Sequence, residues 1–322
     1  MNFRSALKTA ALAILAVAAS SFSSSAHATE LRIATQPAPL YAPIFVAKQK
    51  HWLEDELKKD GVTVKWSSFV AGPPENESFA AGQQDVGVMG DTPAIIARAA
   101  GQNTRIVGIS AVGPKALALA VPKDSPLKTA AELKGKRVAV TKGSYAHHLL
   151  YVILKNAGLQ FSDIKLVHLP PADLVSAFLR GDVDAASTWE PYLSKLTESG
   201  ARILADGTGI KKGELVIIAV DEYAKKNPQL VEKVLRIYQR GYEYIKANAK
   251  EAAELIAPEV KLTPAQLGPV LAKLDFSPVI RPEHVDELRK TEEFLRTHEL
   301  TKNPVDVDAF VDARYLKSAG LK

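Results

Sequence analysis

The sequence has 322 residues, with 41 basic and 36 acidic side chains and no cysteine. Without cysteine there can be no disulfide and no lipid-modified cysteine, so apolar burial alone must hold the fold, which a chain of this length allows. The mild net charge of +5, spread along the chain, does not favour nucleic acid as a partner.

The first 28 residues are typical of a secretory signal. Arg4 and Lys8 precede an apolar stretch, residues 10–19, that is shorter than the roughly 20 residues needed to span a bilayer. The pattern Ala26-His27-Ala28 then matches a cleavage site, so the mature chain is expected to begin at Thr29. We therefore expect a periplasmic protein.

Residues 31–205 predict an α/β fold, because short β-rich runs alternate with helical stretches. Eight runs are predicted as strands of parallel sheets: 31–36, 62–67, 86–90, 105–110, 116–121, 137–141, 164–169 and 183–188. A ninth run, 215–220, follows. Beyond it the pattern is helical only, with helices predicted to start at Asn227-Pro228, Thr263-Pro264 and Arg281-Pro282.

Two α/β sets followed by helices predict two lobes with a cleft between them. The mature length fits two domains at roughly 150 residues each. The crossings are expected near residues 111–115 and 213–215. The predicted organisation is a signal peptide (1–28), the first part of lobe 1 (29–113), lobe 2 (114–214), and the second part of lobe 1 with C-terminal helices (215–322).

Four strand-to-helix joints share one pattern, in which a polar or small residue opens the helix. They are Gln36 and the turn to Ala42-Pro43, Gly90-Asp91-Thr92-Pro93, Lys142-Gly143-Ser144, and Trp189-Glu190-Pro191. The carboxyl ends of parallel strands form the ligand crevice of such sheets, and helix N-termini there suit anions. Each joint also has a purely structural interpretation, with Thr92 and Ser144 as N-caps, Trp189 in the core and Glu190 as a cap.

The stretch "TKGSYAHHLL" (141–150) admits three interpretations. A metal site is disfavoured, because His147 and His148 point about 100° apart on a helix and there is no H-E-x-x-H motif. A Ser144–His147 nucleophile pair lacks a G-x-S-x-G elbow. An anion cradle explains most residues: Gly143 allows close approach, and Ser144, the first helical N–H groups and His147 offer neutral donors. The residues favour an anion without specifying which one.

Four segments carry a resemblance to a known family. "GDTPAIIARAAG" (90–101), "SPLKTAAELKGKRVAVTKGSYAHHLL" (125–150) and "GDVDAASTWEPYLSKLTESGARIL" (181–204) resemble the aliphatic sulfonate and taurine binding proteins of ABC importers. "YAPIFVAKQKHWLE" (41–54) is similar to the broader family that also binds nitrate and pyrimidine precursors. The likeness covers most of the mature chain up to about Val220.

The resemblance implies the two-lobed type II periplasmic binding protein fold with two crossovers. It implies a periplasmic importer component that captures an aliphatic sulfonate as a sulfur source. It further implies a monomer that delivers the solute to an inner-membrane ABC permease, with no cofactor and no catalysis. The ligand contacts that it implies are Gln36, Asp91, Thr92, Ser144, Tyr145, His147, Trp189 and Glu190, with Tyr41 as a further candidate.

Alternatives remain at this point. The solute could instead be a sulfate ester, nitrate or a pyrimidine precursor, or the chain could be an enzyme of the same fold or a sensor partner instead of a transport component. A related enzyme branch that makes the thiamine pyrimidine carries a cysteine cluster, which this chain lacks. The stretch "AGPPENESFAAGQQD" (71–85) departs from the family, with Pro74 and Asn76 where a more regular helix usually starts. The turn "ATQPAPLY" (34–41) departs as well, so both could line the solute's tail.

Overall fold

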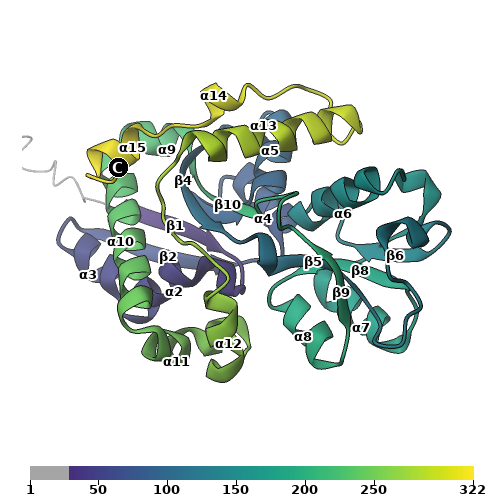
Figure 1. The fold of residues 1–322 in the computed structure, drawn as a ribbon. Coiled ribbons are helices and arrows are strands. Elements are labelled where there is room, and N and C mark those ends of the chain that lie inside the picture. The colour runs from purple at the N-terminus through teal and green to yellow at the C-terminus, as the bar shows by residue number, and fades with distance from the viewer. Residues whose placement is uncertain (1–28) are drawn as a thin grey trace, which may run out of the picture.

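A computed structural model describes residues 29–322, and the predicted signal segment and its cleavage site lie outside them. Figure 1 shows two bodies side by side, each built on a mixed five-stranded sheet. Lobe 1 has the strand order β2-β1-β3-β10-β4: β1 (Thr29–Thr35), β2 (Val62–Ser68), β3 (Val86–Gly90), β4 (Thr104–Val112) and β10 (Glu214–Val220). Lobe 2 has the order β7-β6-β8-β5-β9: β5 (Leu117–Val121), β6 (Arg137–Val140), β7 (Lys165–His168), β8 (Ala185–Trp189) and β9 (Arg202–Asp206).

Helices cover both faces of the lobe 1 sheet. Those of the first half of the chain are α2 (Ala42–Gln49), α3 (Trp52–Lys58), α4 (Gly72–Ala80) and α5 (Asp91–Ala99). After β10 follow α9 (Asp221–Lys226), α10 (Pro228–Ala247), α11 (Ala249–Val260), α12 (Pro264–Leu271), α13 (Pro282–Thr297), α14 (Val307–Phe310) and α15 (Arg314–Ser318). One face packs on α2 and α10, and the other on α5 and α13.

Lobe 2 is smaller, with α6 (Tyr145–Asn156), α7 (Pro171–Arg180) and α8 (Tyr192–Glu198) around its sheet. Short 3-10 turns complete the chain: Pro39–Tyr41, Pro114–Ala116, Ala130–Leu133 and Phe161–Asp163. No helix within residues 29–322 has the length and apolarity that a membrane crossing requires.

All nine predicted strands are present, and the α/β two-lobed fold class is confirmed. The expectation of parallel sheets was only partly right, because β10 runs antiparallel to β3 and β4, and β5 runs antiparallel to β8 and β9. β9 was missed. It lies at an edge of its sheet and is half-exposed, so its sequence lacks the apolar run of a central strand.

The two crossings between the lobes lie side by side. β4 leads into β5 through residues 113–116, and residues 207–213 lead back into β10. The N–H of Gly113 donates to the carbonyl of Gly213 over 3.2 Å. Gly213 has a φ of +62°, and a Cβ atom there would lie 2.6 Å from the carbonyl oxygen of Gly113. Glycine is therefore required at this crossing. The predicted lobe boundaries at 113/114 and 214/215 remain a proposal.

Candidate functional site

The helices begin at the predicted joints. Ser144 is the N-cap of α6, as predicted, and its Oγ accepts from the N–H of His147 over 3.3 Å. Thr92 is not a cap, because α5 already begins at Asp91 and Gly90 occupies the capping position. The Thr92 hydroxyl instead donates to Oδ1 of Asp91 over 3.0 Å. At the third and fourth joints, residues 145 and 192 are the first helical residues.

Joints from the two lobes meet in the structure. A Cβ atom on Gly90 would lie 3.5 Å from Cδ1 of Tyr145, so the first turn of α6 rests on the end of β3. A Cβ atom on Gly143 would lie 3.6 Å from Cδ1 of Ile96 in α5. Gly143 has a φ of +76°, a conformation that suits glycine. The segments that follow β3 and β6 therefore face one another where the lobes meet.

Two of the predicted contact residues present polar atoms without a partner. The hydroxyl of Tyr145 and Nε2 of His147 are buried and make no hydrogen bond to the described residues. Burial, with smaller contributions from Glu190 and Asp91, raises the pKa of Tyr145 well above its usual value, so the hydroxyl keeps its proton. Burial lowers the pKa of His147 to about 4, with a further contribution from Lys142. Both groups are neutral at pH 7, and both can donate a hydrogen bond.

The Ser144 hydroxyl has no free proton to donate to a solute, although the sequence indicates it as a donor. This hydroxyl donates to the carbonyl oxygen of Thr141 over 2.7 Å while accepting from the N–H of His147. A hydroxyl has one proton, and in this arrangement that proton is already used. The geometry therefore supports Ser144 as a cap and gives no support to hydroxyl donation. His147 is not its base, since Nδ1 of His147 lies 3.5 Å from the N–H of Gly143.

Asp91 lies at the predicted joint, but both of its carboxylate oxygens already have partners. Oδ2 accepts from Nζ of Lys211 and from the Thr291 hydroxyl, each over 2.7 Å, and Oδ1 accepts from the N–H of Thr92 over 2.6 Å. The side chains of Asp91 and Lys211 are both fully buried. Although burial lowers the pKa of Lys211, Asp91 and Glu287 raise it by more, so the lysine is charged.

Glu190 is partnered in the same way. Its Oε1 lies 2.9 Å from Nζ of Lys273, which follows α12 in lobe 1. Its Oε2 accepts from the N–H and the hydroxyl of Ser194 in α8, over 3.0 and 2.6 Å. Glu190 thus ties lobe 2 to lobe 1 and accepts from an N–H group in the first turn of α8, whose capping position is Pro191. Since each predicted carboxylate has its own lysine, neither leaves an uncompensated negative charge to repel an anion.

Trp189 ends β8 within an aromatic group. Its ring centroid lies 5.5 Å from that of Tyr145 and 5.9 Å from that of Tyr192. Trp189 is 4% exposed, which is what a core residue would also show. Contact with Tyr145 nevertheless places it beside the unpartnered hydroxyl at the meeting point of the lobes.

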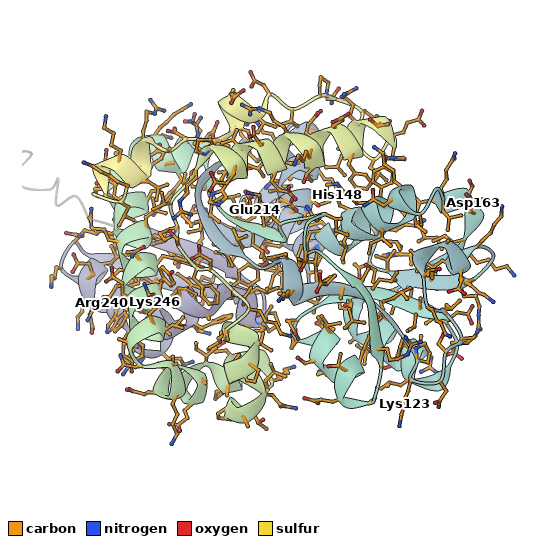
Figure 2. All side chains as sticks on the ribbon, viewed as in Figure 1. Lys123, His148, Asp163, Glu214, Arg240 and Lys246 are labelled. Carbon is orange, nitrogen blue, oxygen red and sulfur yellow. The ribbon has the colours of Figure 1, made fainter. Side chains whose placement is uncertain are left out.

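The adjacent histidines face different neighbours, as their helical positions predict. His147 stacks on Phe161 with centroids 4.9 Å apart, whereas His148 stacks on Phe294 of α13 at 4.3 Å. Nδ1 of His148 lies 3.3 Å from the Thr291 hydroxyl that donates to Asp91. Figure 2 shows His148 where α6 meets α13. Over residues 29–322, no group of three or more His, Cys, Asp or Glu side chains could hold a metal ion.

Gln36 contacts a residue that the sequence did not single out. Its Nε2 lies 2.7 Å from Oε2 of Glu75, and Glu75 is completely buried in the first turn of α4. The segment 71–85, which departs from the family in its sequence, nevertheless forms the regular helix α4. Pro73 and Pro74 fall in the first turn of this helix, where a missing N–H is tolerated. Asn76 donates to the carbonyl of Pro93 over 2.8 Å. This segment therefore joins the second joint to the first.

Lys211, Lys273, Thr291 and Glu75 were missed by sequence reasoning. Lys211 and Lys273 lie 120 and 83 residues from their carboxylate partners, and such pairs leave no local pattern. Lys211 does stand beside the predicted crossing at residues 213–215. Glu75 stands in the segment marked as a departure. Its place in that segment was the only signal that the sequence offered.

The arrangement is the two-lobed fold of the type II periplasmic binding proteins. A family model described as NMT1/THI5 like matches residues 38–252. The chain is 33% identical over 311 residues to a protein of Escherichia coli (strain K12) named as an aliphatic sulfonates-binding protein, covering 94% of this chain and 95% of that relative. The chain belongs to the NMT1/THI5-like family.

Solved structures agree with this assignment. The alkanesulfonate-binding protein SsuA from Xanthomonas axonopodis pv. citri, bound to MOPS, superposes with a TM-score of 0.81 and 32% identity, over 88% of this chain and 98% of that one. The desulfurization enzyme DSZB is similar in fold alone, with a TM-score of 0.70 and 18% identity over 90% and 98% of the two chains. The fold therefore does not by itself separate binding from catalysis.

Proposed function

We propose that this chain is the periplasmic solute-binding component of an ABC importer and that it captures an aliphatic sulfonate between its lobes. The observation that carries the proposal is the likeness along almost the whole chain to an aliphatic sulfonates-binding protein. The signal-like segment, with cleavage after Ala28, supports a periplasmic location. Delivery to an inner-membrane permease follows from this role.

The chemistry of the joints supports an anionic head group. The α6 N-terminus directs N–H groups and a partial positive charge toward the meeting point of the lobes. Tyr145 and His147 add neutral donors, while Asp91 and Glu190 are neutralised by lysines. Sulfonate accepts hydrogen bonds through three oxygens and keeps its charge at any physiological pH. Neutral dipoles can hold it without the cost of burying a new ion pair.

The tail of the solute is assigned to the aromatic side of the site. Trp189 lies between Tyr145 and Tyr192, and an indole ring offers broad apolar contact without fixing one tail shape. Alkyl chains of several lengths fit such a surface.

Binding rather than catalysis is favoured by the state of the candidate nucleophile. The Ser144 proton is directed to Thr141, and the ring of His147 is engaged with Gly143 and Phe161 instead of Ser144. No general base is therefore placed to accept a proton from Ser144, the serine at this joint. We expect no turnover of any bound sulfonate above a heat-killed control.

A thermal-shift panel tests the proposal. Methane-, butane- and hexanesulfonate, taurine, a sulfate ester, nitrate and a pyrimidine precursor are compared, with butanol as a control that has a tail but no anionic head. A solute at 100 times its Kd adds about 2.7 kcal/mol to the free energy of unfolding. We expect the sulfonates to raise the melting temperature and butanol to leave it unchanged. Stabilisation by nitrate or a pyrimidine alone would refute sulfonate binding.

A further inference from the structure

Glu75 places a carboxyl group beside Gln36 at the first strand-to-helix joint. Its side chain is completely buried, and its Oε2 lies 2.7 Å from Nε2 of Gln36. Its Oε1 is also buried and makes no hydrogen bond to the described residues. A Cβ atom on Gly87 would lie 2.7 Å from this Oε1, so β3 carries glycine where the carboxyl group needs room.

Glu75 differs from the other two carboxyl groups at the joints. Asp91 and Glu190 each pair with a lysine, whereas Glu75 takes part in no ion pair within the described chain. Burial raises the pKa of Glu75 well above its usual value, and the hydrogen bond with Gln36 opposes this only in part. A buried carboxyl group without a cation is most stable as the neutral acid.

The neighbours of Glu75 come from three elements. Gln36 follows β1, Tyr41 precedes α2, and Gly87 lies in β3 beside the carboxyl group. Among these only Tyr41 titrates. Burial and Glu75 itself raise the pKa of Tyr41 well above its usual value, so its hydroxyl stays neutral over the working range. Any change of charge at this point therefore belongs to Glu75.

We propose that Glu75 is the positioning residue of the anion site and that its carboxyl group decides which atoms of the Gln36 amide face the solute. The inference rests on the proposed function, since it concerns an anion bound beside Gln36. A neutral Glu75 can donate its O–H to the amide oxygen of Gln36, which turns the NH₂ group toward the anion. An ionised Glu75 can only accept from the NH₂ group, which leaves the amide oxygen facing the anion.

The observed separation fits either arrangement. A distance of 2.7 Å suits an O–H···O hydrogen bond as well as an N–H···O one. Amide oxygen and nitrogen exchange places by a half-turn of the side-chain amide. The site thereby selects a head group that only accepts hydrogen bonds, such as sulfonate, for as long as Glu75 keeps its proton.

Three variants test this by titration calorimetry with butanesulfonate. Glu75→Gln keeps the shape and can still donate to the Gln36 oxygen, but it cannot ionise. Glu75→Leu removes the hydrogen bond. Glu77→Gln makes the same substitution at an exposed position of the same helix and is the matched control. Melting curves without solute show which variants fold, and affinities are measured from about pH 6 to about pH 9.

Different pH profiles are expected for wild type and Glu75→Gln. Wild-type affinity falls as the pH rises through the raised pKa of Glu75, Glu77→Gln follows wild type, and Glu75→Gln stays flat. At the low end of the range Glu75→Leu binds roughly ten- to a hundredfold more weakly than wild type, while Glu75→Gln stays close to it. Should Glu75→Leu not fold, the profile of Glu75→Gln decides.

Failure of the positioning role of Glu75 can be distinguished from failure of the proposed function. If the wild type binds butanesulfonate but Glu75→Gln shows the same pH profile as wild type, the positioning role is overturned and the proposed function stands. If the wild type binds none of the anions in the panel, the proposed function fails, and the role of Glu75 toward an anion fails with it.

Discussion

Replacing Lys211 with methionine removes the one cation that the structure places against Asp91. Methionine keeps most of the length and apolar volume of the side chain. Nζ of Lys211 lies 2.7 Å from Oδ2 of Asp91 and 3.5 Å from Oε1 of Glu287. Glu214 is buried nearby with both carboxyl oxygens unpartnered, and its raised pKa reflects burial and then Asp91. The variant thus leaves a buried carboxylate without compensation.

The expected loss is large. Removing one partner of a buried ion pair costs about 3–5 kcal/mol, because the other charge stays buried. At about 2–4 °C per kcal/mol for domains of roughly this size, the melting temperature should fall by about 10 °C at pH 7.5. The loss should shrink toward pH 5, because a buried carboxyl group without a cation is more stable as the neutral acid, which low pH favours.

Differential scanning calorimetry of four proteins checks this. Lys212→Met is the control, since the Lys212 side chain forms no ion pair in the described chain, and it should change stability by no more than about 0.5 kcal/mol. The double variant Lys211→Met/Asp91→Asn should recover most of the loss, because the amide needs no cation. A single variant that melts within about 2 °C of wild type, or a double variant no better than the single one, would refute the reasoning.

Four further outcomes are expected. Burial lowers the pKa of His147 to about 4. A contribution to the free energy of unfolding on the order of 3 kcal/mol is therefore present above pH 6.5 and is lost as the pH falls toward 4. Melting curves of His147→Gln should lack this part of the pH dependence. Trp189→Ala should weaken hexanesulfonate about tenfold more than methanesulfonate by calorimetry, since lost contact with about two CH₂ groups, at about 0.8 kcal/mol each, corresponds to about tenfold, and equal losses would make Trp189 structural. Ser144→Ala should cost about 0.5–2 kcal/mol of stability and Ser144→Gly only a few tenths, with affinity within about threefold of wild type; a tenfold loss of affinity in both would show that the hydroxyl donates to the solute. Periplasmic material should begin at Thr29 by mass spectrometry, and an earlier start would contradict cleavage after Ala28.

Much of the fold could be predicted because it follows from local patterns. Alternating β-rich and helical runs gave every central strand, and proline at the first helical position marked α10, α12 and α13. Strand direction could not be predicted at the crossings. β5 and β10 each follow another strand without an intervening α-helix, and both run antiparallel to their neighbours. Periodicity reports which face is buried and says nothing about direction.

The site was predictable where it depends on helix N-termini and not where it depends on long-range ion pairs. Ser144 and Tyr145 stand in a recognisable turn of sequence, so their place at the meeting point of the lobes could be expected. The lysines of Asp91 and Glu190 could not be, because the fold alone brings them together. The carboxylates therefore looked like ligand contacts in the sequence, and in the structure they have other partners.

The α6 N-terminus connects the solute region with the contact between the lobes. Tyr145 lies at the meeting point of the lobes, and His148, one turn later, packs on Phe294 and reaches Thr291 in lobe 1. Thr291 donates to the same Asp91 oxygen that accepts from Lys211. Burial and the nearby Lys211 both lower the pKa of His148 well below its usual value. A protonated His148 would stand next to a buried lysine, so the neutral form of His148 is favoured in this arrangement of the lobes.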